Sequence, residues 1–316
     1  MRHADLIEKM SLAEKCAMLQ GATTFGTQPI ERLGIPSVEF SDGPSGVRHQ
    51  AGAADHLGLN ASEPATCFPT AVTMASSWDV ELEERVGAAM GEEAVSQGVG
   101  TLLGPGLCIK RNPLCGRNFE YFSEDPYLTG KMAAAAVRGI QSAGIGACPK
   151  HYAVNSQEMR RQASDSVLDE RTLREIYLTG FEEVVRESAP KTIMTSYNLV
   201  NGSARELMDA VAAGTLSEHD IDERVDEAIE LALSVGPAVA AAPSSFDVDA
   251  HHALAREAAA AGCVLLKNED SLLPLPAHAK VALIGDFAKT PRYQGAGSSA
   301  VNCTRVDSLL GLIGET

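Results

Sequence analysis

Polar side chains that can make strong hydrogen bonds follow several short apolar stretches of the chain. These stretches, each with the motif that ends it, are Ser37–Phe40 with Ser41-Asp42-Gly43-Pro44, Ile145–Pro149 with Lys150-His151-Tyr152, and Thr192–Ser196 with Tyr197-Asn198. Ionised donors and acceptors make shorter and stronger hydrogen bonds than neutral groups. Polar motifs in this position are typical of a (β/α) barrel, which builds its active site from the loops that follow its strands.

Taken one at a time, the same residues have plainer interpretations. An Asp before Gly-Pro, such as Asp42, is ordinarily a turn residue that bonds to its own backbone. A lone histidine such as His151 is more often a satisfied core residue, and Lys150 could end a strand in solvent. Arg117 could simply pair with Glu120 or Glu124. Only their occurrence together favours a binding site.

The elements that would position these residues alternate between short apolar strands and longer amphipathic helices. About five strands are expected, at 37–40, 71–74, 99–103, 145–149 and 192–196. Ser11 and Glu14 predict a capping box, Asp125-Pro126 predicts a helix running to Gly144, and Asp169 predicts another helix start. This alternation predicts an α/β fold built from parallel βα units, of the TIM-barrel type.

The pattern breaks after Asn201-Gly202. Two helices, Ala204–Ala213 and Glu218–Ser234 with Ser217 as cap, are expected in succession with no strand between them. A closed barrel needs eight strands and typically about 250 residues. The sequence therefore predicts an incomplete barrel with a segment missing near position 202, and an open edge beside 192–196.

Three regions are expected along the chain. Residues 1–235 would form the incomplete barrel, and the Ala- and Pro-rich stretch 236–248 a linker. Residues 249–316 would be the start of a second domain, with a helix at His251–Ala261 and strands at Cys263–Leu266 and Val281–Ile284. About 70 residues are few for a complete domain, so we expect this one to be truncated.

Composition excludes several classes of protein. The formal net charge of −16 argues against nucleic-acid binding, which depends on Lys and Arg at phosphates. No apolar run is long enough to cross a bilayer, and Met1–Gln20 lacks the pattern of a secretory signal. The seven cysteines contain no C-x-x-C pair, so we expect neither a zinc site nor a disulfide framework, and a reducing cytoplasm.

Several motifs, taken together and in order, resemble the two-domain β-glucosidase branch of glycoside hydrolase family 3. They are Ser41-Asp42-Gly43-Pro44-Ser45-Gly46-Val47-Arg48, Gly116-Arg117-Asn118-Phe119-Glu120-Tyr121-Phe122-Ser123-Glu124-Asp125-Pro126, Lys150-His151-Tyr152-Ala153-Val154-Asn155, Ser196-Tyr197-Asn198 and Leu265-Leu266-Lys267-Asn268-Glu269. The run around Arg117 is highly specific. The resemblance covers the chain from about residue 10 onward and implies that an α/β sandwich domain begins after the barrel.

The resemblance implies a sugar-binding site that needs no metal and no cofactor. Asp42 would accept hydrogen bonds from sugar hydroxyls in the −1 subsite, Lys150 and His151 would bond to neighbouring hydroxyls, Arg117 would help to fix the ring, and Tyr197 would lie against the nucleophile. Such a set suits a neutral polyol. The implied parent activity is release of terminal non-reducing β-linked glucose, with a β-xylosidase or another exo-β-glycosidase as the alternative.

The residues that would perform the chemistry are not found. Retaining hydrolysis needs two carboxyl groups about 5–5.5 Å apart. The family's nucleophile is an Asp in a Ser-Asp-Trp stretch, but Trp78 is the only tryptophan and stands in another motif. The family's acid/base Glu comes from the C-terminal domain. Glu158 and Asp165 could approach the sugar, but nothing in their spacing gives them a catalytic role. We expect no hydrolysis, or a remnant that only binds sugar.

A nucleotide-binding interpretation depends on one motif, Gly295-Ala296-Gly297-Ser298-Ser299-Ala300, which matches G-x-G-x-x-A. That fingerprint should follow a strand directly and open a helix. Here about ten residues separate it from Ile284, and the residues after it do not favour a helix. A glycine-rich loop is the better interpretation.

Overall fold

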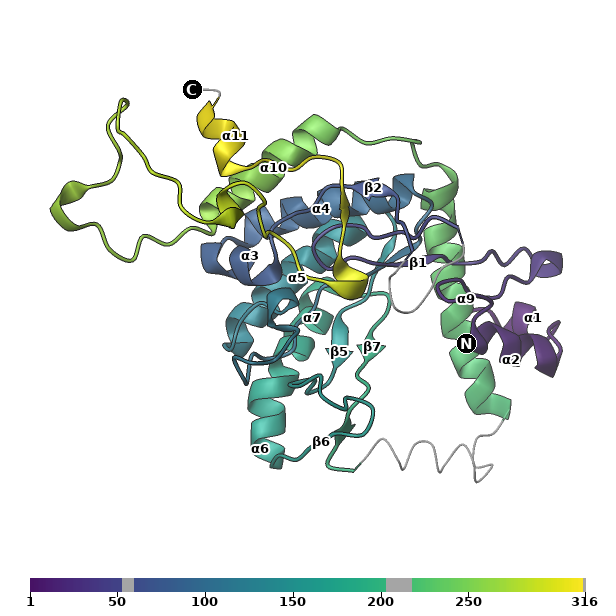
Figure 1. Cartoon of the computed structure of the whole chain (residues 1–316). Coiled ribbons are helices and arrows are strands. Elements are labelled where there is room, and N and C mark those ends of the chain that lie inside the picture. The colour runs from purple at the N-terminus through teal and green to yellow at the C-terminus, as the bar shows by residue number, and fades with distance from the viewer. Residues whose placement is uncertain (53–59, 203–217, 315–316) are drawn as a thin grey trace.

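The computed structural model describes residues 1–52, 60–202 and 218–314. Its centre is a parallel sheet in which β1 (Phe40–Asp42), β3 (Thr101–Leu103) and β4 (Gly146–Ala147) lie in that order. β5 (Lys150–Tyr152) pairs with β7 (Met194–Thr195), also in parallel. Because β4 and β5 lie on one stretch and Gly106 bridges to Lys150, the strands make a continuous arc (Figure 1).

The arc does not close in the described part of the chain. β1 pairs only with β3, and β7 pairs only with β5. The predicted α/β arrangement is confirmed, and β5 is the one neighbour of β7 among the described strands, in agreement with the predicted open edge at 192–196. That the barrel is incomplete stays a prediction. The helix expected at Ala204–Ala213, with the cap Ser217 of the next helix, lies outside the described residues.

The expected strand at Ala71–Met74 was wrong, because these residues begin helix α3 (Ala71–Ser77). Ala71, Met74 and Ala75 are all buried. Their spacing of i, i+3 and i+4 places them on one face of a helix, whereas alternate residues would share the face of a strand. A short apolar run is ambiguous until this spacing is considered. The arc therefore holds four of the five expected strands.

Two helices that cover the sheet approach each other closely, α4 (Val80–Ser96) and α5 (Pro126–Ser142). Asp79 and Asp125 cap their first turns through side-chain bonds to Leu82 N and Leu128 N. A Cβ on Gly139 of α5 would lie 2.2 Å from the Glu84 carbonyl oxygen, so only glycine permits this contact. The helix expected from Asp125-Pro126 is confirmed.

Further short elements precede the long helix that begins at Glu218. The remaining elements are α1 (Ala4–Ile7), α2 (Leu12–Gln20), η1 (Glu31–Leu33), β2 (Pro64–Ala65), η2 (Asn118–Glu120), β6 (Asp165–Ser166), α6 (Glu170–Thr172), the π-helical η3 (Leu173–Leu178), α7 (Thr179–Ser188) and β8 (Leu199–Val200). The capping box of Ser11 and Glu14 and the cap at Asp169 both form as expected.

A second apolar core joins the N-terminal helices to α9 (Glu218–Ala240), as Figure 1 shows. Ile7, Met18, Val225 and Ile229 are all buried there. The helix continues to Ala240 because its end also packs, with Ala238 and Val239 against the main core. The first five residues of the predicted linker 236–248 are therefore helical.

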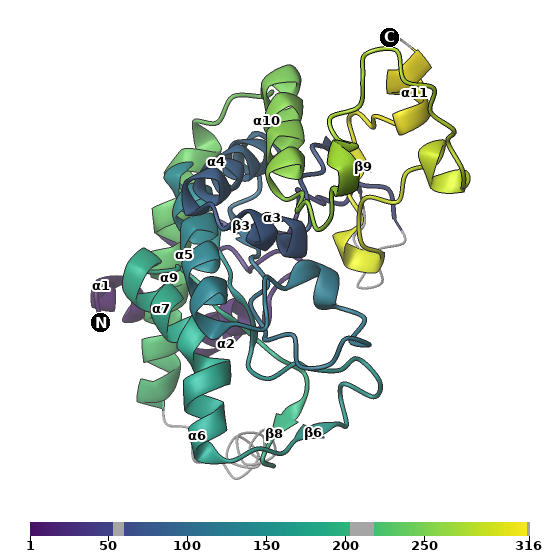
Figure 2. The ribbon, with the colours of Figure 1, turned by 90° about the vertical axis from the view of Figure 1, so that its left-hand side faces the viewer.

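The C-terminal segment returns to the first half of the chain through α10 (Val248–Ala261) and β9 (Asn302–Cys303), with η4 (Glu269–Ser271), η5 (Asp286–Ala288), η6 (Gly297–Ser299) and α11 (Leu309–Gly314) as short elements (Figure 2). α10 packs on α3 and α4, and β9 pairs in parallel with β2. No helix in the described ranges is long and apolar enough to cross a membrane.

The strands expected at Cys263–Leu266 and Val281–Ile284 were wrong. Both stretches are irregular, and Leu266 and Ile284 are 91% and 92% exposed. A strand needs a neighbour for its backbone hydrogen bonds and an apolar layer for its side chains. The described residues supply neither here, so the propensity of these residues for strands is not realised.

The buried carboxyl of Glu83 gives a pH-dependent prediction. Burial raises its pKa to about 8. The folded state therefore holds this proton more tightly than the unfolded chain, whose pKa is about 4.3, and stability falls as the pH rises from that value toward 8. We expect the effect of Glu83→Gln on the free energy of unfolding, relative to the wild type, to be more stabilising at pH 9 than at pH 5. The difference between the two effects should be about 2–4 kcal/mol. Urea unfolding at both pH values measures this difference.

The matched control is Glu81→Gln, an exposed residue in the first turn of the same helix. It should change stability equally at both pH values. An unchanged effect of Glu83→Gln between pH 5 and pH 9 would show that the carboxyl is already ionised in the folded protein.

Candidate sugar site

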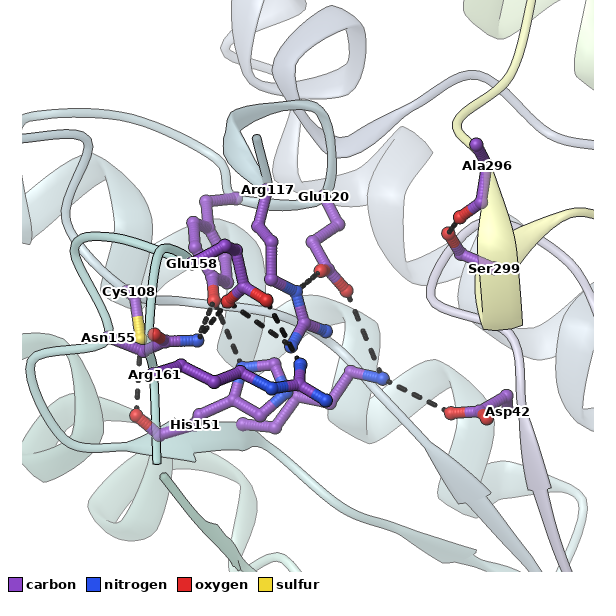
Figure 3. A network of polar contacts seen from close by, with 12 residues as sticks. Asp42, Cys108, Arg117, Glu120, His151, Asn155, Glu158, Arg161, Ala296 and Ser299 are labelled. Atoms are coloured by element: carbon purple, nitrogen blue, oxygen red, sulfur yellow. Dashed lines mark hydrogen bonds and ion pairs between the residues drawn. The ribbon is translucent and has the colours of Figure 1, made fainter. Parts of the chain in front are cut away.

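A buried ammonium group lies at the centre of the polar residues that follow the strands. Lys150 begins β5, and its side chain is only 3% exposed. Its Nζ lies 3.6 Å from Asp42 Oδ1, at the end of β1, and 3.9 Å from Glu120 Oε2. Figure 3 shows Asp42 and Glu120 on the two sides of these contacts. Asp42 and Glu120, which precede Lys150 by 108 and 30 positions in the sequence, thus meet one cation.

Arg117 continues this row on the far side of Glu120. Its Nε donates a hydrogen bond to Glu120 Oε1, and its terminal nitrogen lies 3.9 Å from Glu158 Oε1. Burial opposes the charge on Arg117, but the carboxylate of Glu120 outweighs it and holds the pKa of the guanidinium above its usual value. The site therefore alternates in charge, and each buried ion has an opposite neighbour.

His151 lies behind the charged row, next to a tyrosine. Its Nδ1 is 3.0 Å from the hydroxyl of Tyr121, and both side chains are buried. Burial, together with the positive charges of Arg117 and Lys150, holds the pKa of His151 well below its usual range. The imidazole is neutral at physiological pH and can share hydrogen bonds as donor and acceptor.

Tyr197 reaches the same cluster through Arg161. The guanidinium of Arg161 lies over the Tyr197 ring at 4.5 Å, and its NH1 is 3.0 Å from Glu158 Oε2. Glu158 also accepts a hydrogen bond from Asn155 at 3.1 Å. Such a stacked guanidinium fixes the plane of the ring. Tyr197 itself is 54% exposed and forms the rim of the cluster.

The expected clustering of Asp42, Arg117, Lys150, His151 and Tyr197 at one end of the strands is confirmed in its geometry. The pair of Arg117 with Glu120, which the sequence offered as a plainer interpretation, does form. The sequence did not indicate that Glu120 also faces Lys150 or that Arg161 stacks on Tyr197. The i, i+3 spacings of Arg117 with Glu120 and of Glu158 with Arg161 were available signals, but such pairs are common on ordinary surfaces.

Of the two acidic residues considered after Lys150-His151, only Glu158 joins the cluster. Asp165 lies in β6, which pairs with β8. Its Oδ1 accepts a hydrogen bond from Gly202 N at 3.2 Å, so it holds the connection after β8. Asp165 is a structural residue in this chain.

The glycine-rich loop near residue 295 packs on the residues beside the site. A Cβ on Gly295 would lie 2.2 Å from the ring of Phe119, so the loop backbone lies directly on that ring. Arg48 Nε donates to the Ala300 carbonyl oxygen at 2.9 Å. Figure 3 shows Ala296 and Ser299 on the Asp42 side of the cluster. Since the loop opens only the three-residue η6, a dinucleotide fingerprint is not supported.

The described residues contain no group of three or more His, Cys, Asp or Glu side chains arranged to hold a metal ion. The cluster itself presents alternating charges that can form hydrogen bonds, with a neutral imidazole and a tyrosine at its edges. A polyhydroxylated ring is a suitable ligand for such a surface.

Parallel βα units with polar residues gathered at the carboxyl ends of the strands define the barrel class of enzymes. Residues 51–218 match the family described as "Glycosyl hydrolase family 3 N terminal domain", and residues 263–316 match "Glycosyl hydrolase family 3 C-terminal domain". The chain belongs to glycosyl hydrolase family 3. The resemblance found in the motifs is confirmed, together with the α/β fold class.

Similar proteins include a "Thermostable beta-glucosidase B" from Acetivibrio thermocellus, which is 44% identical over 96% of this chain and 47% of its own length. An "Exo-alpha-(1->6)-L-arabinopyranosidase" from Bifidobacterium longum is 38% identical over 98% of this chain and 49% of its own. The solved β-glucosidase 3B from Thermotoga neapolitana, in complex with α-D-glucose, has a TM-score of 0.89 at 32% identity, covering 100% of this chain and 54% of its own.

The chain spans about half the length of these relatives, and it also lacks residues inside the shared region. The alignment with the Acetivibrio protein runs over 359 positions, whereas 96% of 316 residues is about 303. About 56 positions of that relative, 359 less 303, therefore have no counterpart here. This difference agrees with an internal gap of several tens of residues.

The ion cluster gives a prediction about stability. Lys150→Met would leave the buried carboxylates of Asp42 and Glu120 without their shared cation. Removing one partner of a buried ion pair costs about 3–5 kcal/mol. We therefore expect urea unfolding to show a loss of this size at pH 7. Adding Asp42→Asn to Lys150→Met should restore part of it, because the charge that Lys150 offset is removed.

The control is Lys131→Met, which breaks a surface ion pair with Glu187. Surface pairs contribute less than about 1 kcal/mol, so this variant should remain close to the wild type. If Lys150→Met were as stable as Lys131→Met, the charge on Lys150 would not hold the cluster together.

Proposed function

We propose that the cluster around Lys150 is the −1 subsite of a retaining exo-β-glucosidase and binds a terminal, non-reducing β-linked glucosyl unit. The observation that supports this best is the row of Asp42, Lys150, Glu120 and Arg117, in which Glu120 Oε2 accepts no hydrogen bond from the described residues. Buried acceptors normally have a donor. A sugar hydroxyl would supply one.

In this proposal each residue has a defined part. Asp42 accepts hydrogen bonds from ring hydroxyls, while Lys150 and the neutral His151 bond to their neighbours. Arg117 fixes the same ring from the Glu120 side, and Arg161 holds Tyr197 at the rim. The similar Thermotoga protein was solved with glucose, which supports a hexose as ligand.

We also propose that the chain as given binds its sugar without hydrolysing it appreciably. The carboxylates of the cluster are engaged with cations: Asp42 and Glu120 with Lys150, and Glu158 with Arg161. A nucleophile and an acid/base must be free to attack and to transfer a proton. The missing segment after Gly202 is where the resemblance places the nucleophile, and the parent enzyme would supply it there.

For the cellular location we propose a reducing compartment such as the cytoplasm. All seven cysteines are unbridged and scattered through the structure. A secreted protein of this cysteine content would more often carry disulfides.

Binding of glucose tests the assignment of the site. Asp42→Asn keeps the shape of the side chain but removes its charge, and hydrogen bonds to charged groups contribute about 1.5–3 kcal/mol. We expect glucose affinity, measured by ligand-observed NMR or calorimetry, to fall by about tenfold or more. Asp165→Asn is the matched control, because the Asp165 carboxylate accepts its hydrogen bond from Gly202 N, outside the cluster, and this variant should bind glucose as the wild type does.

Turnover tests the second part of the proposal. We expect no release of nitrophenol from 4-nitrophenyl β-D-glucoside or 4-nitrophenyl α-L-arabinopyranoside above a heat-inactivated control, because acid/base catalysis alone contributes about 10²–10⁴-fold. A burst of nitrophenol, with a glycosyl adduct mapped by mass spectrometry to Glu120, Glu158 or another carboxylate, would contradict this and identify the nucleophile.

A further inference from the structure

Two cysteines from opposite ends of the chain meet where the C-terminal segment joins the first half of the protein. β2 pairs with β9 so that Ala65 lies opposite Cys303, and Thr304 N donates to the Ala65 carbonyl at 3.0 Å. Cys67 follows β2 by two residues. The chain between the two cysteines therefore closes a loop of more than two hundred residues.

One side-chain amide touches both sulfur atoms. Cys67 Sγ lies 3.7 Å from Gln294 Oε1, and Gln294 Nε2 lies 3.8 Å from Cys303 Sγ. Gln294 is itself fixed, because its Oε1 accepts from Val301 N at 2.7 Å and its Nε2 donates to the Val301 carbonyl at 3.2 Å. The fixed amide of Gln294 thus contacts the sulfur atom of each cysteine, so both sulfur atoms lie next to the same amide group.

The two thiols differ in reactivity. The hydroxyl of Tyr293 lies 3.1 Å from Cys303 Sγ. The neighbouring Cys67 thiol, and then this hydroxyl, lower the pKa of Cys303 to about 7 against partial burial. The contact with Cys303 and burial raise the pKa of Cys67. Cys303 is thus the nucleophile of the pair, since the thiolate is the reactive form.

Cys67 borders an open pocket, and Cys303 is itself partly exposed. Cys67 and Tyr293 line an open pocket together with His252, Arg256 and Arg305. The two arginines give this pocket positive charges, although Asp307 offsets part of them. These charges favour a small anionic disulfide such as oxidised glutathione as the reagent.

We propose that Cys67 and Cys303 form a redox-reversible disulfide that ties β9 of the C-terminal segment to β2 of the barrel portion. This assignment does not depend on the proposed sugar site.

The reaction proceeds by two thiol–disulfide exchanges. The Cys303 thiolate attacks one sulfur of oxidised glutathione, which breaks the glutathione S–S bond, releases one glutathione thiolate and leaves a mixed disulfide on Cys303. Cys67 then loses its proton and attacks Cys303 Sγ, releasing the second glutathione. Two protein thiols are oxidised by two electrons, one glutathione disulfide is reduced to two thiols, and the two protons end on them. An excess of reduced glutathione reverses both steps.

The bond would affect the site because the glycine-rich loop lies between these elements and the sugar cluster. Gly295 rests on Phe119, and Arg48 bonds to Ala300, only three residues before Cys303. Fixing Cys303 to Cys67 restricts the loop 295–301 without any contact to the sugar-binding residues themselves. Disulfides of intracellular proteins are commonly transient and regulatory in this way.

Mass spectrometry of the full chain tests the proposal directly. The reduced protein is incubated with excess oxidised glutathione at pH 7.5, quenched with acid and digested without reduction. We expect the intact protein to lose two hydrogens and a peptide pair linking Cys67 to Cys303 to appear. In limited proteolysis, cleavage within 286–301 should be slower in the oxidised protein and should return to the original rate after dithiothreitol.

Single variants separate the two roles. Cys67→Ser should accumulate a glutathione adduct on Cys303, because no second thiol displaces it. In Cys303→Ser, Cys67 should react more slowly than Cys303 does in Cys67→Ser, because burial still raises the pKa of the Cys67 thiol when Cys303 is replaced. Cys263→Ser is the matched control at an exposed cysteine outside the pair, and it should still form the bond.

Two results would overturn the proposal. One is a wild-type protein in which glutathione stays attached to Cys303 while Cys67 remains a free thiol. The other is a disulfide that maps to a different pair, such as Cys16 with Cys263. Both are read from the wild-type digest, so they do not depend on whether a variant folds.

Discussion

The charge on Lys150 is the constraint around which the polar part of this protein is organised. A buried ammonium is tolerated only where opposite charges offset its loss of hydration. Asp42 and Glu120 meet that need from two different places, the end of β1 and η2 after β3. Glu120 in turn accepts a hydrogen bond from Arg117, and Arg117 lies 3.9 Å from the carboxylate of Glu158. One desolvated cation thus determines the relative positions of three segments.

The parallel strands are what make this arrangement possible. Because β1, β3 and the stretch from β4 to β5 run in the same direction, the residues at their carboxyl ends share one edge. The close contact of α4 with α5 through glycine holds the layer behind these strands. Among residues 1–52, 60–202 and 218–314 the sheet has no strand beyond β7, yet the cluster lies on strands that have their neighbours. The proposed binding groups can therefore be in place where the barrel itself is incomplete.

The C-terminal segment shows how strongly local preference depends on surroundings. Its helix α10 forms because His251 and the alanines of one face pack on α3 and α4, with His251 Nδ1 2.7 Å from the buried carboxylate of Glu93. The apolar stretches around Leu266 and Ile284 have no such layer and stay irregular and exposed. Only at β9 does a partner strand exist, and there the segment attaches to the rest of the chain and brings Cys303 beside Cys67.

The sequence by itself determined the features that depend on neighbours along the chain. Local spacing of residues predicts the caps at Ser11, Asp125 and Asp169, the helices that follow them and four of the strands. The family motif around Arg117 is likewise a local pattern. What only the tertiary structure decided are contacts between distant residues: that Glu120 and Lys150 form a pair, that Arg161 covers Tyr197, and that Asp165 bonds to Gly202 instead of joining the site. Whether 71–74 became a helix and 263–266 remained irregular was decided by the surface available for each to pack against. Hydrogen-bond partners and buried area are properties of the folded chain, and no short window of sequence contains them.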